Sequence, residues 1–298
     1  MDCSILISTR NRISELKVTL SSIDKKIGED VEILVCDDNS SDGTFNYLKN
    51  NFPKIRVFQN SKRMGYLFNR NLLMSKVRTK FAMSLDDDAS LISEKPLKKC
   101  KEYFEKHPSC GVIAFRIFWG RSLPSNFNHS ENSKRVKSFV GCGHIWRMDA
   151  WRGIPSYPEW FKFYGEENFA SFQLLKKDWE IHYVPEILIN HRVDNIKRQK
   201  DKDFYRRRSN ALKADWFNIL LFYPTKNAAR LIFYSIVKQF EKAWIQRDSK
   251  VLISLFKSMI GILLNLDNIL KERNQLTQKE FRKWKGLSNT QIYWSPNN

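Results

Sequence analysis

The chain has 298 residues and a formal charge of +19, from 51 Lys and Arg against 32 Asp and Glu. A chain of this length can bury a substantial core and corresponds to one large domain or two small ones. Its five cysteines are odd in number and form no CxxC pair. This argues against a disulfide framework or a zinc knuckle and favours a reducing compartment.

Positive charge is concentrated in the last third of the chain. Residues 196–298 contain 21 Lys and Arg and 8 Asp and Glu, which gives a net charge of +13. Such a segment could bind nucleic acid or anionic lipid, or simply form a solvated helical face. We expect no signal peptide, and the longest apolar stretch, 251–266, is shorter than the roughly 18 residues of a membrane span. The predicted location is cytoplasmic, or peripheral at the inner face of the cell membrane.

Strand-like apolar runs alternate with helical periodicity through the first ninety residues. The alternation predicts an α/β fold with a mainly parallel sheet and helices on both faces. The expected strands are 4–8, 31–36, 55–58 and 81–85, and the expected helices are 14–23, 42–48 and 69–77.

The rest of the chain is less regular and then becomes helical. We predict an α/β region at 1–195, with halves at about 1–90 and 91–195, and a basic helical extension at 196–298. Within these regions the expected strands are 111–118, 179–185 and 187–191, and the expected helices are 166–176, 227–244 and 249–271, with a helical pattern from 197 onward.

Three consecutive aspartates, Asp86, Asp87 and Asp88, follow the strand at 81–85. Adjacent carboxylates repel one another and disfavour strand pairing, so they indicate a neutralising cation, with a solvated acidic turn as the alternative. Oxygen ligands suit magnesium or manganese, which complete their shells with water and substrate phosphates. Asp37 and Asp38 end an earlier strand, and the carboxyl ends of parallel strands meet at one edge. The two clusters could therefore line one crevice.

Five short motifs occur in a fixed order along the chain. They resemble those of the nucleotide-sugar-dependent glycosyltransferases of family 2, which have the GT-A fold, and the resemblance covers about residues 2–195. The motifs are Ser8 to Arg12, Asp37 to Thr44, Arg70-Asn71, Asp86 to Asp88, and Gly165 to Glu167.

The resemblance implies a donor site at the ends of the first strands. There the end of the first strand lies beside the nucleotide, Asp38 and its neighbour Asp37 accept hydrogen bonds from base or ribose, and Asp86 or Asp87 holds the ribose. The implied donor-binding residues are Ser8, Thr9, Asn11, Asp37, Asp38, Arg70, Asp86 and Asp87.

The resemblance also implies a metal site formed by Asp88 with Asp86 and His191, holding Mn²⁺ or Mg²⁺ between the two phosphates. The ion stabilises charge on the departing diphosphate. His191 closes an apolar strand, where a core or surface histidine is the alternative.

The pair Glu166-Glu167 matches the family's second acidic pair, and Glu167 takes the position of the catalytic base. It would accept the proton of an acceptor hydroxyl as that oxygen attacks the anomeric carbon with inversion. Taken alone, the pair could equally be capping chemistry, because a helix N-terminus favours carboxylates. Some relatives carry an acidic residue where this chain has Phe169. Trp160 could stack on a sugar ring or fill the core.

The expected function is transfer of a sugar from a nucleotide-diphosphate sugar, most commonly a UDP-sugar, to a glycan or lipid-linked acceptor. The setting implied by the resemblance is bacterial surface polysaccharide or glycoconjugate synthesis. A sugar nucleotidyltransferase is one alternative, although residues 8–12 lack the glycines of its phosphate loop. A nucleic-acid-binding protein is another, but the usual recognition signatures are missing, so we expect no nucleic-acid partner.

The helical extension carries an apolar stripe bordered by Lys250 and Lys257. The stripe could rest on an anionic membrane surface, pack on the catalytic region or form a homodimer face. Its residues are Leu252, Leu255, Phe256, Met259, Leu263 and Leu266.

Overall fold

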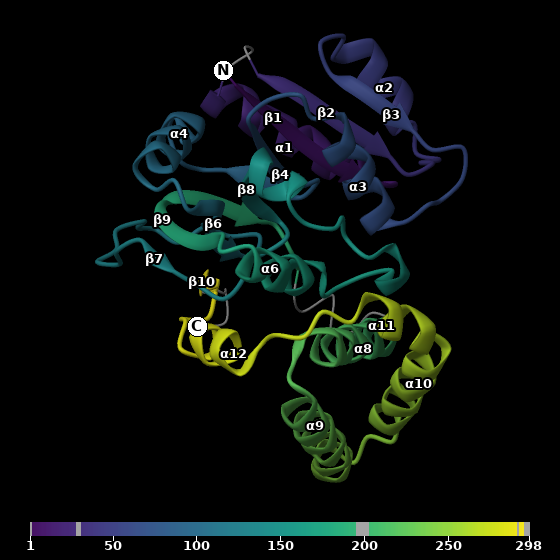
Figure 1. Ribbon diagram of the computed structural model, residues 1–298. Coiled ribbons are helices and arrows are strands. Elements are labelled where there is room, and N and C mark those ends of the chain that lie inside the picture. The colour runs from purple at the N-terminus through teal and green to yellow at the C-terminus, as the bar shows by residue number, and fades with distance from the viewer. Residues whose placement is uncertain (1, 28–30, 195–202, 291, 295–298) are drawn as a thin grey trace.

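A single mixed sheet organises the protein (Figure 1). The computed structural model describes residues 2–27, 31–194, 203–290 and 292–294. Within them the ten strands are β1 (Cys3–Thr9), β2 (Glu32–Asp37), β3 (Arg56–Gln59), β4 (Phe81–Asp86), β5 (Ala89–Leu91), β6 (Cys110–Trp119), β7 (Lys134–Arg135), β8 (Gly143–Arg147), β9 (Glu180–His191) and β10 (Ile292–Trp294).

Helices cover the sheet and continue beyond it. The helices of the first part are α1 (Ile13–Ile27), α2 (Thr44–Asn51), α3 (Tyr66–Lys76), α4 (Pro96–Lys106), α5 (Met148–Arg152) and α6 (Glu166–Lys176). The later ones are α8 (Phe204–Phe222), α9 (Thr225–Gln246), α10 (Lys250–Leu264), α11 (Leu266–Glu272) and α12 (Gln278–Lys285).

The first four strands of the order β3-β2-β1-β4-β8-β6-β9-β5 are parallel to one another. Because β1 lies between β2 and β4, Thr9 is opposite Asp37 and Ser8 is opposite Asp86. The four strands predicted in the first ninety residues, and the predicted meeting of the two acidic clusters at one sheet edge, are therefore confirmed. Parallel strands bring their carboxyl ends to the same edge, where ligands of such sheets bind.

The second half of the sheet is partly antiparallel. β8 pairs antiparallel with β4 and with β6, and β5 pairs antiparallel with β9. The chain thus turns back after the aspartate triplet, and Ala89 lies opposite His191. This register brings the end of β9 beside the end of β4, although the two are about a hundred residues apart in sequence.

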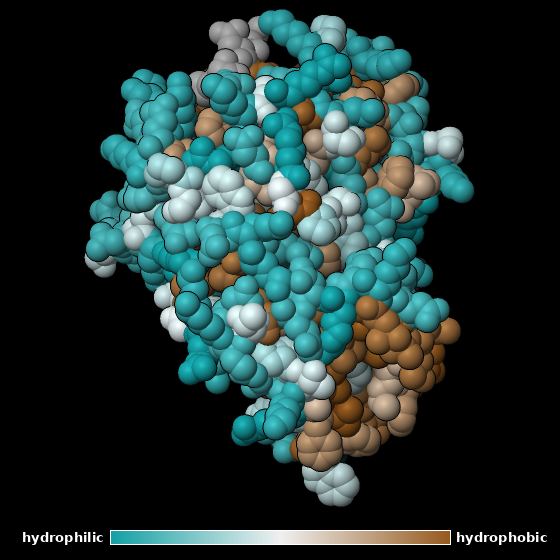
Figure 2. Space-filling view, viewed as in Figure 1, coloured by the Kyte–Doolittle hydropathy of each residue, from teal (hydrophilic) through white to brown (hydrophobic). Residues whose placement is uncertain are grey.

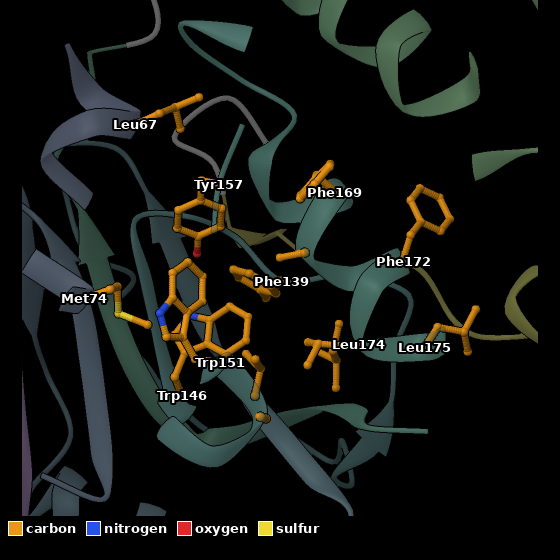
Figure 3. Close-up of a cluster of buried hydrophobic side chains, with 14 of the residues drawn as sticks. Leu67, Met74, Phe139, Trp146, Trp151, Tyr157, Phe169, Phe172, Leu174 and Leu175 are labelled. Carbon is orange, nitrogen blue, oxygen red and sulfur yellow. The ribbon is translucent and has the colours of Figure 1, made fainter. Parts of the chain in front are cut away.

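Two hydrophobic clusters form the core. One includes Leu16 and Leu20 of α1 and Phe104 of α4, and the other includes residues of α3, α5, α6, α8 and α12. Figure 3 shows part of the second cluster, where Trp151 lies between Trp146 and Tyr157, with ring centroids 5.1 and 4.9 Å away. This aromatic packing supports β8 and the loop that leads to α6.

Several elements differ from the sequence prediction. α4 was not predicted, and β9 is one strand where two were expected, with a pairing irregularity near Pro185 that accommodates the missing N–H. The expected helix 249–271 is divided into α10 and α11, which bend by 60°. At the break, the Asn265 side chain donates to the carbonyl of Gly261 at 2.8 Å, so it competes with the helical backbone pattern.

The last third of the chain is helical, as predicted, but it also returns to the sheet. α8 and α12 pack on α6, and β10 pairs with β6. α9 and α10 project away from the sheet (Figure 1). The predicted boundary at 195–196 and the start of the pattern from Lys197 lie outside the described residues. Among the described helices, no single one has the length and apolarity to cross a membrane, and only the bent pair α10 and α11 meets those criteria together.

Candidate active site

The aspartate triplet is surrounded by cations and hydroxyl donors at the carboxyl edge of the sheet. Thr9 donates from Oγ1 to Asp87 Oδ2 at 2.8 Å, and Arg12 Nη1 lies 2.9 Å from Asp87 Oδ1. The other nitrogen of the same guanidinium, Nη2, lies 2.7 Å from Asp88 Oδ2. Arg12 therefore joins two of the three carboxylates, a contact that sequence reasoning missed.

His191 completes this group from β9. Its Nε2 lies 3.1 Å from Asp88 Oδ1 and 3.9 Å from Asp86 Oδ2. Burial alone would lower the pKa of His191, but its contacts with Cys142 and Asp88 outweigh burial and raise this pKa to about 11. Burial likewise opposes ionisation of Asp88, yet His191 and Arg12 hold the pKa of Asp88 well below its usual range. Asp88 is thus ionised at neutral pH.

Asp86, Asp88 and His191 also have the chemistry of a metal site. Each can offer one ligand atom, and the three atoms lie within 4.8 Å of one another. Two carboxylates and one imidazole suit manganese or magnesium, which take their remaining ligands from phosphate and water. The three predicted metal ligands are therefore brought together, and their donor set fits a divalent ion.

Asp38 is buried and holds the loop that leads into α3. Its Oδ1 accepts from the amide of Met64 at 2.7 Å and from Asn60 Nδ2 at 2.9 Å, and its Oδ2 accepts from the amide of Gly65 at 3.0 Å. Asp37 accepts from the amide of Ser40 at 3.1 Å. Both predicted donor carboxylates thus fix nearby loop backbone.

Asn11 and Ser8 lie on either side of the end of β1. Asn11 has a positive φ of 52° and accepts from the amide of Ser41 at 2.7 Å, so it joins the first loop to the second. Ser8 lines a small pocket together with Arg70 and His144. The loop after β1 is therefore held in place by the loop after β2. Contacts of Ser8 and Asn11 with the donor stay a prediction.

Arg70 connects the metal side of the site to the loop before β8. It is buried, and its Nη2 donates to Asp86 Oδ1 at 2.9 Å and to the carbonyl of Gly141 at 2.5 Å. Tyr66 flanks it, with its ring centroid 4.4 Å from the guanidinium carbon and its hydroxyl donating to Asp86 Oδ1 at 3.2 Å. Tyr66 lies outside the five motifs, so the sequence analysis did not identify it as a site residue.

Glu166 and Glu167 begin α6, directly after Gly165, whose φ of +83° favours glycine. The amide of Gly141 donates to Glu167 Oε1 at 3.1 Å. Burial and the neighbouring Glu167 carboxylate raise the pKa of Glu166 well above its usual range, and burial also raises the pKa of Glu167. The N–H and C=O of Gly141 thus link the Glu167 carboxylate to Arg70 and, through it, to Asp86.

The comparison with known families agrees with this geometry. Residues 4–171 match the profile of Glycosyl transferase family 2, which is more than half of the chain. The chain belongs to this family. It is a glycosyltransferase, as the ordered motifs implied.

Two bacterial members of the family are similar in sequence. The chain is 34% identical over 217 residues to the GalNAc(5)-diNAcBac-PP-undecaprenol beta-1,3-glucosyltransferase of Campylobacter jejuni, covering 68% of this chain and 69% of that protein. It is 31% identical over 141 residues to the UDP-Glc:alpha-D-GlcNAc-diphosphoundecaprenol beta-1,3-glucosyltransferase WfgD of Escherichia coli. That match covers 47% of this chain and 56% of WfgD.

Two solved structures share the fold of this glycosyltransferase. S. aureus TarS in complex with UDP matches with a TM-score of 0.54 at 20% identity, covering 74% of this chain and 66% of that one. GalNAc-T7 with UDP, GalNAc and Mn²⁺ matches with a TM-score of 0.58 at 16% identity, covering 74% and 48%. The GT-A fold expected from the motifs is therefore confirmed.

In this family 2 glycosyltransferase, a helix of the C-terminal region supports the start of α6. Asn218 of α8 donates to the carbonyl of Gly165 at 2.9 Å, and a Cβ on Gly165 would come within 2.9 Å of Ala214. Trp160 packs against Phe217 with ring centroids 4.6 Å apart. This packing agrees with the core-filling alternative for Trp160, and its sugar-stacking role stays a prediction.

Proposed function

We propose that this glycosyltransferase transfers a hexose from a UDP-sugar to a hydroxyl of an undecaprenyl-diphosphate-linked glycan, with inversion at the anomeric carbon. The names of the two similar bacterial proteins support the acceptor class and the beta linkage, and one of them names UDP-Glc as donor. The observation that carries the proposal is the continuous link from Asp86 through Arg70 and Gly141 to Glu167. It holds a donor-side carboxylate and a base carboxylate in one site.

The donor side of the site suits a diphosphate held through a cation. Asp86, Asp88 and His191 would hold Mn²⁺ or Mg²⁺, which when bound stabilises negative charge on the departing UDP. Arg12 supplies a further positive charge beside Asp88, and its side chain is 41% exposed. A cation at the mouth of the site can contact the phosphates, because the guanidinium already faces the edge where they would lie.

Deprotonation of the acceptor hydroxyl requires a carboxylate that is ionised and has a pKa above that of an ordinary glutamate. As the acceptor oxygen bonds to the anomeric carbon, the bond from that carbon to the diphosphate oxygen breaks and the acceptor proton passes to Glu167. A raised pKa makes Glu167 a better proton acceptor than an exposed glutamate. Burial and the Glu167 carboxylate raise the pKa of Glu166 as well, so the two neighbouring carboxyls titrate as a pair above the ordinary glutamate range.

Nucleotide binding tests the donor half of this proposal. We would measure the thermal shift of the wild type, Asp88→Ala and the exposed control Asp149→Ala with UDP, dTDP, GDP and CDP, each with and without Mn²⁺. UDP with Mn²⁺ should stabilise the wild type and the control but not Asp88→Ala. Stabilisation by another nucleotide, or an equal shift in all three proteins, would overturn the donor assignment.

Product analysis tests the reaction. With UDP-glucose and a short undecaprenyl-diphosphate-linked acceptor, the wild type should release UDP and form a beta-linked product, and Glu167→Gln should form neither at a comparable rate. Formation of a UDP-sugar from UTP and a sugar 1-phosphate would instead show the rival nucleotidyltransferase activity. An alpha-linked product would contradict the inverting mechanism for this alpha-linked donor.

A further inference from the structure

Apolar side chains are exposed mainly on one part of the molecule. Of the twenty large apolar side chains exposed in the described residues, fifteen lie on three consecutive helices, and we call them the α9–α11 surface. They are Leu231, Phe233, Tyr234, Val237, Phe240, Trp244, Ile245, Ile253, Phe256, Met259, Ile260, Leu263, Leu264, Leu266 and Leu270. Figure 2 shows the apolar colour gathered over α10. A soluble monomer seldom exposes so large a group without a binding role.

Helical spacing places these side chains on outward faces. On α9, Phe233, Val237, Phe240 and Trp244 repeat every three or four residues, and Trp244 is 85% exposed. On α10, the opposite face is occupied, because Ser258 donates to the carbonyl of Ser209 in α8. The outward faces therefore have no neighbour within the described part of the chain.

The predicted apolar stripe is partly wrong in its membership. Leu255 is fully buried and Leu252 is half-buried, because that side of α10 packs inward. Phe256, Met259 and Leu263 are exposed, so these residues do not pack on the catalytic region, which was one of the three alternatives. The surface also extends over α9, which the stripe did not include.

Basic side chains border this surface. Residues 225–272 contain eight Lys and Arg and four Asp and Glu. Lys242 and Arg247 flank the exposed Trp244, and Lys250 and Lys257 flank the exposed residues at the start of α10. All four basic side chains are exposed. An apolar face with basic and aromatic edges matches the acyl and headgroup layers of an anionic bilayer.

We propose that the α9–α11 surface rests on a membrane containing anionic lipid, with the helices in the plane of the interface. An in-plane arrangement agrees with the composition of these helices, since none of them by itself meets the combined length and apolarity criteria for a span. Charge favours lipid over a second copy of this chain. Two copies would bring like-charged borders together on a protein of formal charge +19, whereas anionic headgroups neutralise them.

The helices that carry this surface contact the segment that precedes the base. Trp160 Nε1 donates to Glu272 of α11 at 2.9 Å, and Asn218 of α8 holds Gly165 before the base. The α9–α11 surface is thus connected by direct contacts to the segment that enters α6. A lipid-linked acceptor would reach Glu167 from that side; this consequence rests on the proposed function, whereas the docking itself does not.

Vesicle binding by the purified protein tests the proposal. We would sediment the wild type with phosphatidylcholine vesicles, with and without phosphatidylglycerol, and compare Phe256→Glu/Leu263→Glu with the control Val18→Glu/Leu123→Glu. Val18 and Leu123 are 48% and 45% exposed and lie away from this surface. The wild type and the control should bind the anionic vesicles, and the α9–α11 variant should lose about tenfold or more in partitioning.

Two further measurements distinguish an anionic membrane from a second copy of this chain as the partner of the α9–α11 surface. Lys250→Gln/Lys257→Gln should weaken binding to phosphatidylglycerol vesicles and reduce its salt dependence, because lipid charge is part of the proposal. A wild type that stays in solution with both vesicle types would overturn it. So would light scattering that shows a dimer dissociated by Phe256→Glu/Leu263→Glu, without vesicle binding. The UDP thermal shift of the same samples separates this failure from failure of the donor site.

Discussion

Asp88 is a buried carboxylate beside the end of β4 and Glu167 is a half-buried carboxylate at the start of α6, and their surroundings move their pKa values in opposite directions. Asp88 lies between Arg12 and His191, which hold its pKa well below the usual range. Glu167 faces Glu166 and a backbone amide, and burial raises its pKa. Carboxylates separated in this way can take different roles, one remaining an anionic ligand and the other accepting a proton. The cations around each group, more than the burial itself, make this difference.

The largest effect is expected from removing the base. Glu167→Gln keeps the shape of the side chain and can still accept from the amide of Gly141, but it cannot take a proton. We expect kcat for transfer to fall about 100- to 10,000-fold with little change in UDP affinity. Steady-state kinetics with saturating donor measures this, with the exposed Glu105→Gln as control. A loss of UDP binding of the same size would mean that Glu167 belongs to the donor side.

A smaller loss is expected from moving the base without removing it. A Cβ on residue 141 would lie 2.5 Å from Glu167 Oε1, so Gly141→Ala displaces that carboxylate. We expect a fall in kcat of about 10- to 100-fold, because a displacement of about 1 Å has effects of this size. Gly153→Ala is the matched control, since its nearest neighbour would lie at 3.4 Å. Equal kinetics for both variants would show that the contact with Gly141 does not position the base.

The pH dependence of transfer should report the raised pKa of the glutamate pair. Glu167 must be ionised to act, so kcat should fall about tenfold per pH unit as pH decreases below the raised pKa of the pair. This fall should begin above the ordinary glutamate value of 4.5. A pH–rate profile at saturating donor measures it. A rate that stays constant down to the ordinary glutamate range would remove the argument for a specialised base.

The same pKa shift has a consequence for stability. A carboxyl whose folded pKa is raised stabilises the fold fully below its unfolded pKa and loses that contribution as pH rises through the folded value. Above the raised folded pKa, the ionised Glu167 is therefore a destabilising residue. Glu167→Gln should raise the melting temperature at neutral pH and lose this difference at low pH, which calorimetry at several pH values would show.

The smallest effect is expected from removing the Arg12 guanidinium beside the aspartate triplet. Arg12→Gln leaves Asp87 and Asp88 without their shared guanidinium, and because that side chain is 41% exposed, the cost should be only about 1 kcal/mol. Mn²⁺ should restore more stability to the variant than it adds to the wild type, since the ion supplies the missing charge. Thermal shifts with the exposed neighbour Arg10→Gln as control would measure this. Equal Mn²⁺ shifts in all three proteins would contradict it.

Local patterns were sufficient to predict much of the fold and part of the site. Alternating strands and helices fix which strand ends meet, so the convergence of Asp37 with Asp86 followed from topology. The motif order also identified His191, which reaches Asp88 because β5 reverses against β9.

The remaining features depend on contacts between distant segments. Arg12 pairs with an aspartate 76 positions away, and Gly141 joins Arg70 to Glu167 across three elements. Asp38 is occupied by loop amides. No periodicity or spacing encodes these contacts, since they depend on how loops fold over the finished sheet. The exposure of α9 was missed for the same reason, because the apolar pattern of a helix is the same whether that face is buried or exposed.

The backbone bonds at the end of α8 give the C-terminal helices an unexpected architecture. The amide of Asn274 donates to the carbonyl of Leu221 at 3.0 Å, and the amide of Leu276 donates to Phe222 at 2.8 Å. The end of α8 and the segment after α11 are therefore adjacent, so the helices α9 to α11 form an insertion whose two ends lie side by side. In the proposed arrangement, the segment that docks on the membrane is thus an insertion between two adjacent points of the chain, outside the strands and the base helix.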